Sequence, residues 1–260
     1  MDASTTVTTV RELSGVTRAQ LAQMAGVAPS TLGRIERGEI DPSWSSMMAI
    51  MEAAGFRYDN RLKSLQNLSA ITAARIAITG TRRTLPNDPA AQKWFERWTR
   101  AGLVANGRAT PGNVSTLALI AANANKIVDR PGARSFAYTR PWQDIASEIA
   151  DLGTNWATTG INAANGGHRD ATDEWPVFYL ENVDVSATAT GLIEAAEGQR
   201  RVTLLPYSAL VDAGSHIDDA GFRWADPVHA LIDAYATPGR SADRADAISP
   251  KFETREESAA

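Results

Sequence analysis

The side chains best suited to chemistry lie between residues 17 and 37, where polar and basic residues recur at helical spacing. Ser30 and Arg34 are four residues apart, so a helix that begins at Pro29 presents both on one face. An arginine there can donate two hydrogen bonds to O6 and N7 of guanine, and a serine can reach a base or a phosphate. Thr17 and Arg18, at the start of a preceding helix, can hold a backbone phosphate. These groups indicate contact with duplex DNA.

We expect the outer face of the second helix to carry most of these contacts. Pro29, Ser30, Gly33 and Arg34 are predicted to point outwards, with Arg34 as the residue that reads guanine. The full set of predicted DNA-binding residues is Thr17, Arg18, Pro29, Ser30, Thr31, Gly33, Arg34 and Arg37. The alternative is a helical hairpin whose arginines are only solvated.

Two helices joined by a tight turn are needed to position these residues. Thr17 is a favourable N-cap for a helix over residues 18–24, and Gly26 tolerates the positive φ of a reversal. Pro29 fits the first turn of the second helix, and Gly38 follows its end. The apolar residues that would seal the helices together are Leu21, Ala22, Ala25, Val27, Leu32 and Ile35.

A further helix is predicted after Asp41-Pro42-Ser43, which forms a capping sequence. Its large apolar residues are all expected in the core: Trp44, Met47, Met48, Ile50 and Met51.

Residues 5–60 resemble the Xre/Cro/C1 family of helix-turn-helix repressors through the motif GVTRAQLAQMAGVAPSTLGRIERGEIDPS. The resemblance implies an all-α bundle of about five helices that binds operator DNA. Arg18 stands where the family often has glutamine, and it adds positive charge toward phosphate. Ala28 stands where a capping Ser or Thr is common, and it weakens the start of the second helix.

Charge is unevenly distributed over the 260 residues, although the formal net charge is only −4. Residues 1–60 carry 5 Lys and Arg against 7 Asp and Glu, residues 61–140 carry 13 against 3, and residues 141–260 carry 8 against 20. This segregation predicts separate roles for a basic middle and an acidic C-terminal part. The content of 43% hydrophobic and 22% charged residues is ordinary for a globular protein.

The expected fold class is multi-domain, with four successive parts. An all-α helix-turn-helix bundle at 1–60 precedes a basic, mainly helical middle at 61–135, an acidic α/β (α+β) domain at 136–245, and a flexible tail at 246–260. The middle is predicted to contain helices at 62–78, 89–101 and 116–128, and a turn at Asn106-Gly107. The acidic domain is predicted to contain helices at 143–152, 187–196 and 228–235, and strands at 177–180 and 201–205.

Basic side chains of the middle region form a second set of predicted DNA contacts. The set comprises Arg82, Arg83, Arg97, Arg100 and Arg108, to which Arg130 and Arg134 can be added. Neutralising several phosphates would make DNA binding steeply salt-dependent. The alternative is that this basic surface docks on the acidic part of the same chain.

Residues 136–245 resemble the C-terminal domain of AbiEi-like antitoxin regulators of type IV toxin–antitoxin systems. The resemblance rests on WATTGINAA at 156–164, WPVFYL at 175–180, VTLLP at 202–206 and WADPVHALIDAY at 224–235. It implies a protein that represses its own operon and opposes a partner toxin, which in that family is a nucleotidyltransferase-like enzyme. The usual family member has a winged helix before this domain, whereas this chain has the Xre-like segment.

No residue pattern supports an enzyme, and we expect neither a cofactor nor a metal. A nucleotidyltransferase typically holds Mg²⁺ with two carboxylates two residues apart, and Asp170, Asp173 and Glu174 form no such pair. His168, His216 and His229 lack the spacing of zinc ligands. The absence of cysteine excludes disulfides and fits a cytoplasmic protein. No apolar stretch reaches the roughly 18 residues of a membrane span.

Three functions remain open from the sequence. The first is a DNA-binding autorepressor that acts as an antitoxin, with operator DNA and a cognate toxin as partners. The second is a ligand-responsive or phage-type repressor whose C-terminal domain senses a ligand or forms a homodimer. The third is a nucleotidyltransferase-like enzyme tethered to DNA, which the missing carboxylate pair disfavours.

Overall fold

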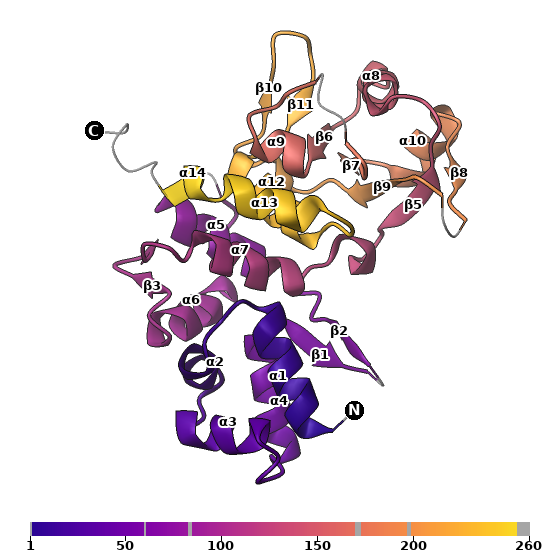
Figure 1. Ribbon diagram of the computed structural model, residues 1–260. Coiled ribbons are helices and arrows are strands. Elements are labelled where there is room, and N and C mark those ends of the chain that lie inside the picture. Colours follow the sequence, from indigo (N-terminus) through magenta and orange to yellow (C-terminus); the bar gives the residue numbers. More distant parts are fainter. Residues whose placement is uncertain (1, 60, 83–84, 170–172, 197–198, 254–260) are drawn as a thin grey trace. The chain divides into compact units, whose positions relative to one another are not determined.

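The computed structural model describes residues 2–59, 61–82, 85–169, 173–196 and 199–253 (Figure 1). The chain forms two compact units. The helical unit comprises Met1–Thr81, Asp88–Asn125 and Phe252–Ala260, and the sheet unit comprises Arg82–Asn87 and Lys126–Lys251. The predicted bundle at 1–60 and most of the predicted basic middle therefore pack together in one unit, and the second unit begins its long segment at Lys126. The expected multi-domain layout, a mainly helical N-terminal part followed by an α/β part, is confirmed.

The helical unit begins with four helices and a hairpin. They are α1 (Ala3–Leu13), α2 (Arg18–Ala25), α3 (Pro29–Glu36), α4 (Trp44–Ala53), β1 (Phe56–Tyr58) and β2 (Leu62–Ser64). The hairpin corrects the predicted helix at 62–78, because Phe56 and Ser64 pair across antiparallel strands. The helix of that region, α5, spans only Ser69–Thr79.

The remainder of the helical unit contains the basic middle region. Its elements are α6 (Ala91–Arg100), β3 (Val104–Ala105), β4 (Arg108–Ala109) and α7 (Val114–Asn123). The Asn106-Gly107 turn joins β3 to β4, and both of its residues have positive φ, at 51° and 78°. Two such residues form the turn that matches the twist of a hairpin. Helix α14 (Pro250–Glu253) ends the described part of the chain.

One expected core residue of the helical unit lies at the surface. Trp44 is 65% exposed, whereas Ile50 and Met51 of the same helix are buried, and Met47 and Met48 are half-buried. Ser43 caps α4 by accepting a hydrogen bond from Ser46 N at 3.2 Å, as predicted for this segment. Trp44 is the first residue after this cap, and its side chain lies against Tyr58.

The sheet unit is built on seven strands in the order β10-β11-β6-β7-β9-β5-β8. The strands are β5 (Arg134–Ala137), β6 (Trp156–Thr159), β7 (Val177–Leu180), β8 (Ile193–Glu194), β9 (Arg201–Pro206), β10 (His216–Ile217) and β11 (Arg223–Trp224). Strand β7 pairs parallel with β9 and antiparallel with β6, so the sheet is mixed. The two predicted strands at 177–180 and 201–205 form its buried centre.

Helices lie on both faces of this sheet. They are α8 (Trp142–Asp151), α9 (Ile161–Ala164), α10 (Val183–Ala189), α11 (Ala209–Asp212), α12 (Pro227–Ala236) and α13 (Ser241–Ile248), with a short 3-10 helix at Ile127–Asp129. Successive side chains of a strand point to opposite faces. Phe178 of β7 therefore contacts Trp142 of α8, with ring centroids 6.4 Å apart, while its neighbour Tyr179 bonds to Asp233 of α12.

The predicted helix at 187–196 is wrong in its second half. Helix α10 ends at Ala189, and Gly191, with φ 63°, follows it. Ile193 and Glu194 then form the edge strand β8. Helix α13 runs through Ile248, and residues 254–260 of the predicted tail lie outside the described residues.

Candidate nucleic-acid interface

The two helices of the predicted motif form as the sequence indicated. Thr17 accepts a hydrogen bond from Gln20 N at 3.2 Å, and the Gln20 side chain accepts one from Thr17 N at 2.8 Å, which makes a capping box at the start of α2. Gly26, with φ 71°, ends the helix in the left-handed region. Helix α3 starts at Pro29 after Ala28, whose side chain cannot cap it. The first amides of α3 therefore remain for another acceptor.

The inner side of α3 is sealed by apolar residues. Leu32 and Ile35 of α3 are buried, as is Leu21 of α2, the helix on which α3 packs. On the outer side, Pro29, Ser30, Arg34 and Arg37 are exposed, and Thr31 is half-buried. Gly33 is the exception among the predicted outward residues, because it is buried. Without a side chain of its own, Gly33 is covered by Arg18 and Arg37.

A buried glutamate links three helices at this interface. Glu36 has a side chain only 5% exposed, and its Oε1 accepts a hydrogen bond from Arg11 Nε of α1 at 2.6 Å. Its other oxygen accepts one from Arg18 Nε of α2. Burial alone would raise the pKa of Glu36, but the two arginine bonds and charges outweigh it, so the pKa lies below its ordinary value. Glu36 is therefore ionised and holds Arg18 against α3.

A second glutamate orients the other two arginines. Glu39 accepts hydrogen bonds from Arg37 Nε at 2.5 Å and from Arg37 Nη2 at 3.1 Å, and Arg34 Nε lies 3.6 Å from it. The bond from Arg37 is the main cause that lowers the pKa of Glu39. Arg18, Arg34 and Arg37 have side chains 50%, 54% and 55% exposed, so these ion pairs leave the guanidinium groups open to solvent.

The predicted secondary contacts come from several elements of the described residues. Arg97 of α6 pairs with Glu52 of α4 at 3.3 Å and lies over the Trp94 ring. Arg100, also on α6, and Arg108, on β4, are exposed. Arg82 belongs to the sheet unit, and Arg83 lies outside the described residues. Whether any of them touches DNA stays a prediction.

Arg130 and Arg134 have other roles in the sheet unit. Arg134 on β5 bonds to both Asp184 and Glu194. Arg130 is buried, donates to Asp233 Oδ1 at 2.6 Å, and also donates to the Tyr179 hydroxyl. Asp233 is 0% exposed and further accepts bonds from Thr159 and Tyr179 at 2.7 and 2.9 Å. Arg130 therefore forms an ion pair in the core, so its side chain is not at the surface, where a contact with DNA was predicted.

Sequence reasoning missed this buried network, which also includes His229, 3.1 Å from the Tyr179 hydroxyl. Burial would raise the pKa of Asp233, but the charges of Arg130 and His229 outweigh it and keep that pKa below its ordinary value. The partners come from segments as far apart as Arg130 and Asp233, so no local spacing could reveal them. An Asp inside the apolar run of 228–236 was the one available signal.

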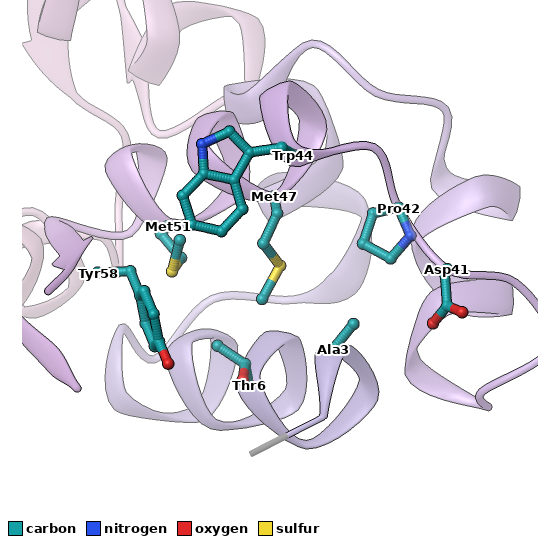
Figure 2. Close-up of a pocket in the computed structure, with 8 residues that line it drawn as sticks. All are labelled: Ala3, Thr6, Asp41, Pro42, Trp44, Met47, Met51 and Tyr58. Atoms are coloured by element: carbon teal, nitrogen blue, oxygen red, sulfur yellow. The ribbon is translucent and has the colours of Figure 1, made fainter. Parts of the chain in front are cut away.

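An apolar groove opens on the helical unit beside α1 and α4. Trp44 and Tyr58 line it with their rings edge to face, 6.2 Å apart. Figure 2 shows Met51 between these two rings and Met47 between Trp44 and α1. Ala3 and Thr6 close the α1 side, and the groove encloses about 290 Å³.

The described residues contain no group of three or more His, Asp or Glu that could hold a metal ion. In the same residues, no helix has the length and apolar character of a transmembrane segment.

Comparison with known proteins bears on the N-terminal segment. Residues 4–65 match the family model of the helix-turn-helix domain. This match covers almost all of α1, continues through β2, and includes both α2 and α3. Neither curated proteins nor solved structures gave a match to this chain. The chain thus carries a helix-turn-helix domain, which supports a role as a DNA-binding regulator.

Proposed function

We propose that this chain is a sequence-specific transcriptional regulator that inserts α3 into the major groove of duplex DNA. One observation carries the proposal: α3 is sealed on its inner side by Leu32 and Ile35, yet its outer edge exposes Ser30 and Arg34. A helix with one apolar and one polar edge fits a groove that admits a single helix. Arg34 is the proposed guanine contact, and Thr17 and Arg18 are proposed to contact phosphate.

The test is selection of duplexes from a random-sequence library by the full-length chain at low salt. We expect one short motif to be enriched, and binding to it should exceed binding to random duplex at moderate salt. If no motif is enriched, and if the chain binds no duplex even at low salt, the proposed function is wrong.

The role of Arg34 is tested on the selected duplex. Arg34→Ala should cost about 1–3 kcal/mol there and relax the preference at one base position. Arg140→Ala is the matched control, because Arg140 is also partly exposed and held by a glutamate, Glu148, but belongs to the sheet unit. An equal loss on selected and random duplex would instead make Arg34 a phosphate contact.

The finer role, autorepression by an antitoxin, stays a prediction. The resemblance of residues 136–245 to AbiEi-like regulators has no support in the comparisons with known proteins. It predicts that the chain protects DNA upstream of its own gene and that an adjacent gene encodes a toxin that the chain neutralises. Footprinting of the upstream DNA and co-expression with the neighbouring gene test the two parts separately. We also propose that the chain is not an enzyme and acts in the cytoplasm, where its DNA target lies.

A further inference from the structure

The groove beside α1 and α4 has the size and the lining of a small-molecule site. Its volume of about 290 Å³ is close to the lower end of the roughly 300–1,000 Å³ typical of ligand pockets. Two aromatic rings and two thioethers, those of Trp44, Tyr58, Met47 and Met51, form most of its apolar lining. Both rings are exposed, Trp44 to 65% and Tyr58 to 41%. A ligand with an apolar body would remove this surface from water, which is favourable.

One end of the groove carries a negative charge. Asp41 and Tyr58 lie at opposite ends of the row of lining residues in Figure 2. The eight lining residues include one carboxylate, that of Asp41, and no Lys, Arg or His. In the part of the chain that the structure describes, Asp41 has no ion pair or hydrogen bond of its own. Its charge is therefore available to a cation at that end of the groove.

The charge of the surrounding segment favours the same kind of ligand. Residues 1–60 carry 5 Lys and Arg against 7 Asp and Glu, so their field attracts cations and repels anions. An apolar groove with a carboxylate at one end thus complements a molecule that has an ammonium group at one end and an apolar body.

The walls of the groove are connected directly to α3. Ser4 follows the lining residue Ala3 in α1, and its hydroxyl donates a hydrogen bond to the Glu36 carbonyl at the end of α3. Asp41 belongs to the loop that runs from α3 to α4. A ligand that fills the groove would therefore hold α1 and this loop in the arrangement that leaves the outer side of α3 exposed.

We propose that this groove is an effector site for an amphipathic organic cation, with the ammonium group at Asp41 and the apolar body against Trp44, Met47 and Tyr58. The groove has room for about ten water molecules at roughly 30 Å³ each, so a ligand with about that many non-hydrogen atoms fills it. Because the groove is open in the conformation that exposes α3, the bound cation favours this conformation and strengthens DNA binding. The effect on DNA rests on the proposed function, whereas binding of the cation does not.

The first test compares three probes that share a phenylalkyl body and differ in charge: phenylbutylamine, phenylbutanol and phenylbutyrate. Each is titrated into the full-length chain and followed by ligand-detected saturation-transfer NMR. We expect the amine to bind with a Kd of about 1 mM or tighter, and the neutral and anionic probes to bind more weakly. An amine that binds no more tightly than the alcohol would overturn the proposal.

Variants locate the bound amine. Asp41→Asn should weaken amine binding about 2- to 5-fold and leave the alcohol unaffected, because it removes only the charge. Ala3→Leu, which fills the groove, should weaken both probes, and circular dichroism checks that it folds. Asp59→Asn is the matched control, because Asp59 follows Tyr58 but pairs with Lys63 and does not line the groove. It should leave amine binding unchanged.

Three results would overturn the site itself. Equal losses in Asp41→Asn and Asp59→Asn would mean that the amine senses only the general field of the segment. Amine binding that Ala3→Leu leaves intact would place the amine elsewhere. A chain that sediments as a dimer, and becomes a monomer in Ala3→Leu, would show that a second copy covers the groove.

The second test measures affinity for the selected duplex with and without saturating amine, at constant ionic strength. We expect binding about 5-fold tighter with the amine in wild type and no change in Ala3→Leu. Unchanged duplex affinity in a chain that binds the amine would overturn the effector role. A chain that binds the amine but no duplex would reject the proposed function and leave the cation site standing.

Discussion

Replacement of two glycines in and after α3 should have opposite effects on stability. Gly33 lies inside the helix, and the nearest atoms to an added Cβ are 3.4 Å away, an ordinary contact distance. Alanine is favoured over glycine inside a helix by about 1 kcal/mol, so Gly33→Ala should stabilise the helical unit by about 0.5–1 kcal/mol. Gly38 has φ 69° and nothing within 4 Å of an added Cβ. Gly38→Ala should therefore cost about 1–2 kcal/mol from backbone strain alone.

Native-state hydrogen exchange of amides in α2 and α3 measures these changes without unfolding the sheet unit. We expect slower exchange in Gly33→Ala and faster exchange in Gly38→Ala. Faster exchange in Gly33→Ala would refute the packing argument, because it would mean that the arginines cannot accommodate a methyl group.

Three further predictions concern the carboxylates. Glu39→Gln removes a negative charge beside Arg34 and Arg37, so binding to random duplex should tighten by about 2- to 5-fold at low salt, measured by fluorescence anisotropy; weaker binding would contradict this. The pKa of Glu36 is lower in the folded chain than its ordinary value of 4.5, so its stabilising contribution is present above pH 4.5 and is lost as the pH falls through the lower, folded value. Thermal melts below pH 4.5 should therefore fall less steeply for Glu36→Gln than for wild type. Asp233→Asn leaves Arg130 buried without a countercharge and should destabilise the sheet unit by about 3–5 kcal/mol in urea, whereas Asp212→Asn, which breaks an exposed pair, should cost less than about 1 kcal/mol.

The sequence was most informative where one residue type dictates the local backbone. Thr17 is suited to the N-cap of a helix, Gly26 to its C-terminal end and Pro29 to its first turn. The structure places each residue at that position. Asn106-Gly107 is a second example, because positive φ at two successive residues selects a hairpin turn.

The sequence-based prediction was weaker where the burial or secondary structure of a residue depends on residues far away in the chain. The burial of Gly33 results from the Arg18 side chain, which reaches it from another helix because Glu36 holds it there. Residues 62–68 continue into a helical pattern, yet pairing with Phe56–Tyr58 makes Leu62–Ser64 a strand. Tertiary context overrides local propensity in such short segments.

The candidate site shows the same division. Its helices and their exposed outer residues followed from the sequence, whereas the ion pairs that orient the arginines did not. The formal charge of residues 1–60 is negative, which looks unfavourable for binding DNA. That count treats Glu36 and Glu39 as charges independent of the arginines. In the structure both glutamates are bonded to arginines and act on their orientation.

The surface position of Trp44 gives the protein a natural optical reporter. Five of the seven tryptophans, Trp94, Trp98, Trp142, Trp156 and Trp224, are at most 5% exposed, and Trp175 is half-buried, whereas Trp44 is 65% exposed. An indole in water emits at longer wavelength than one in a protein interior, and iodide or acrylamide reaches it first. The long-wavelength edge of the emission spectrum therefore comes mainly from Trp44. This residue begins α4 and stands two residues after Pro42, in the loop that follows α3. Changes in the surroundings of Trp44, beside the helix-turn-helix, can therefore be followed by fluorescence in unlabelled protein. The Trp44→Phe variant, which lacks this signal, is the control.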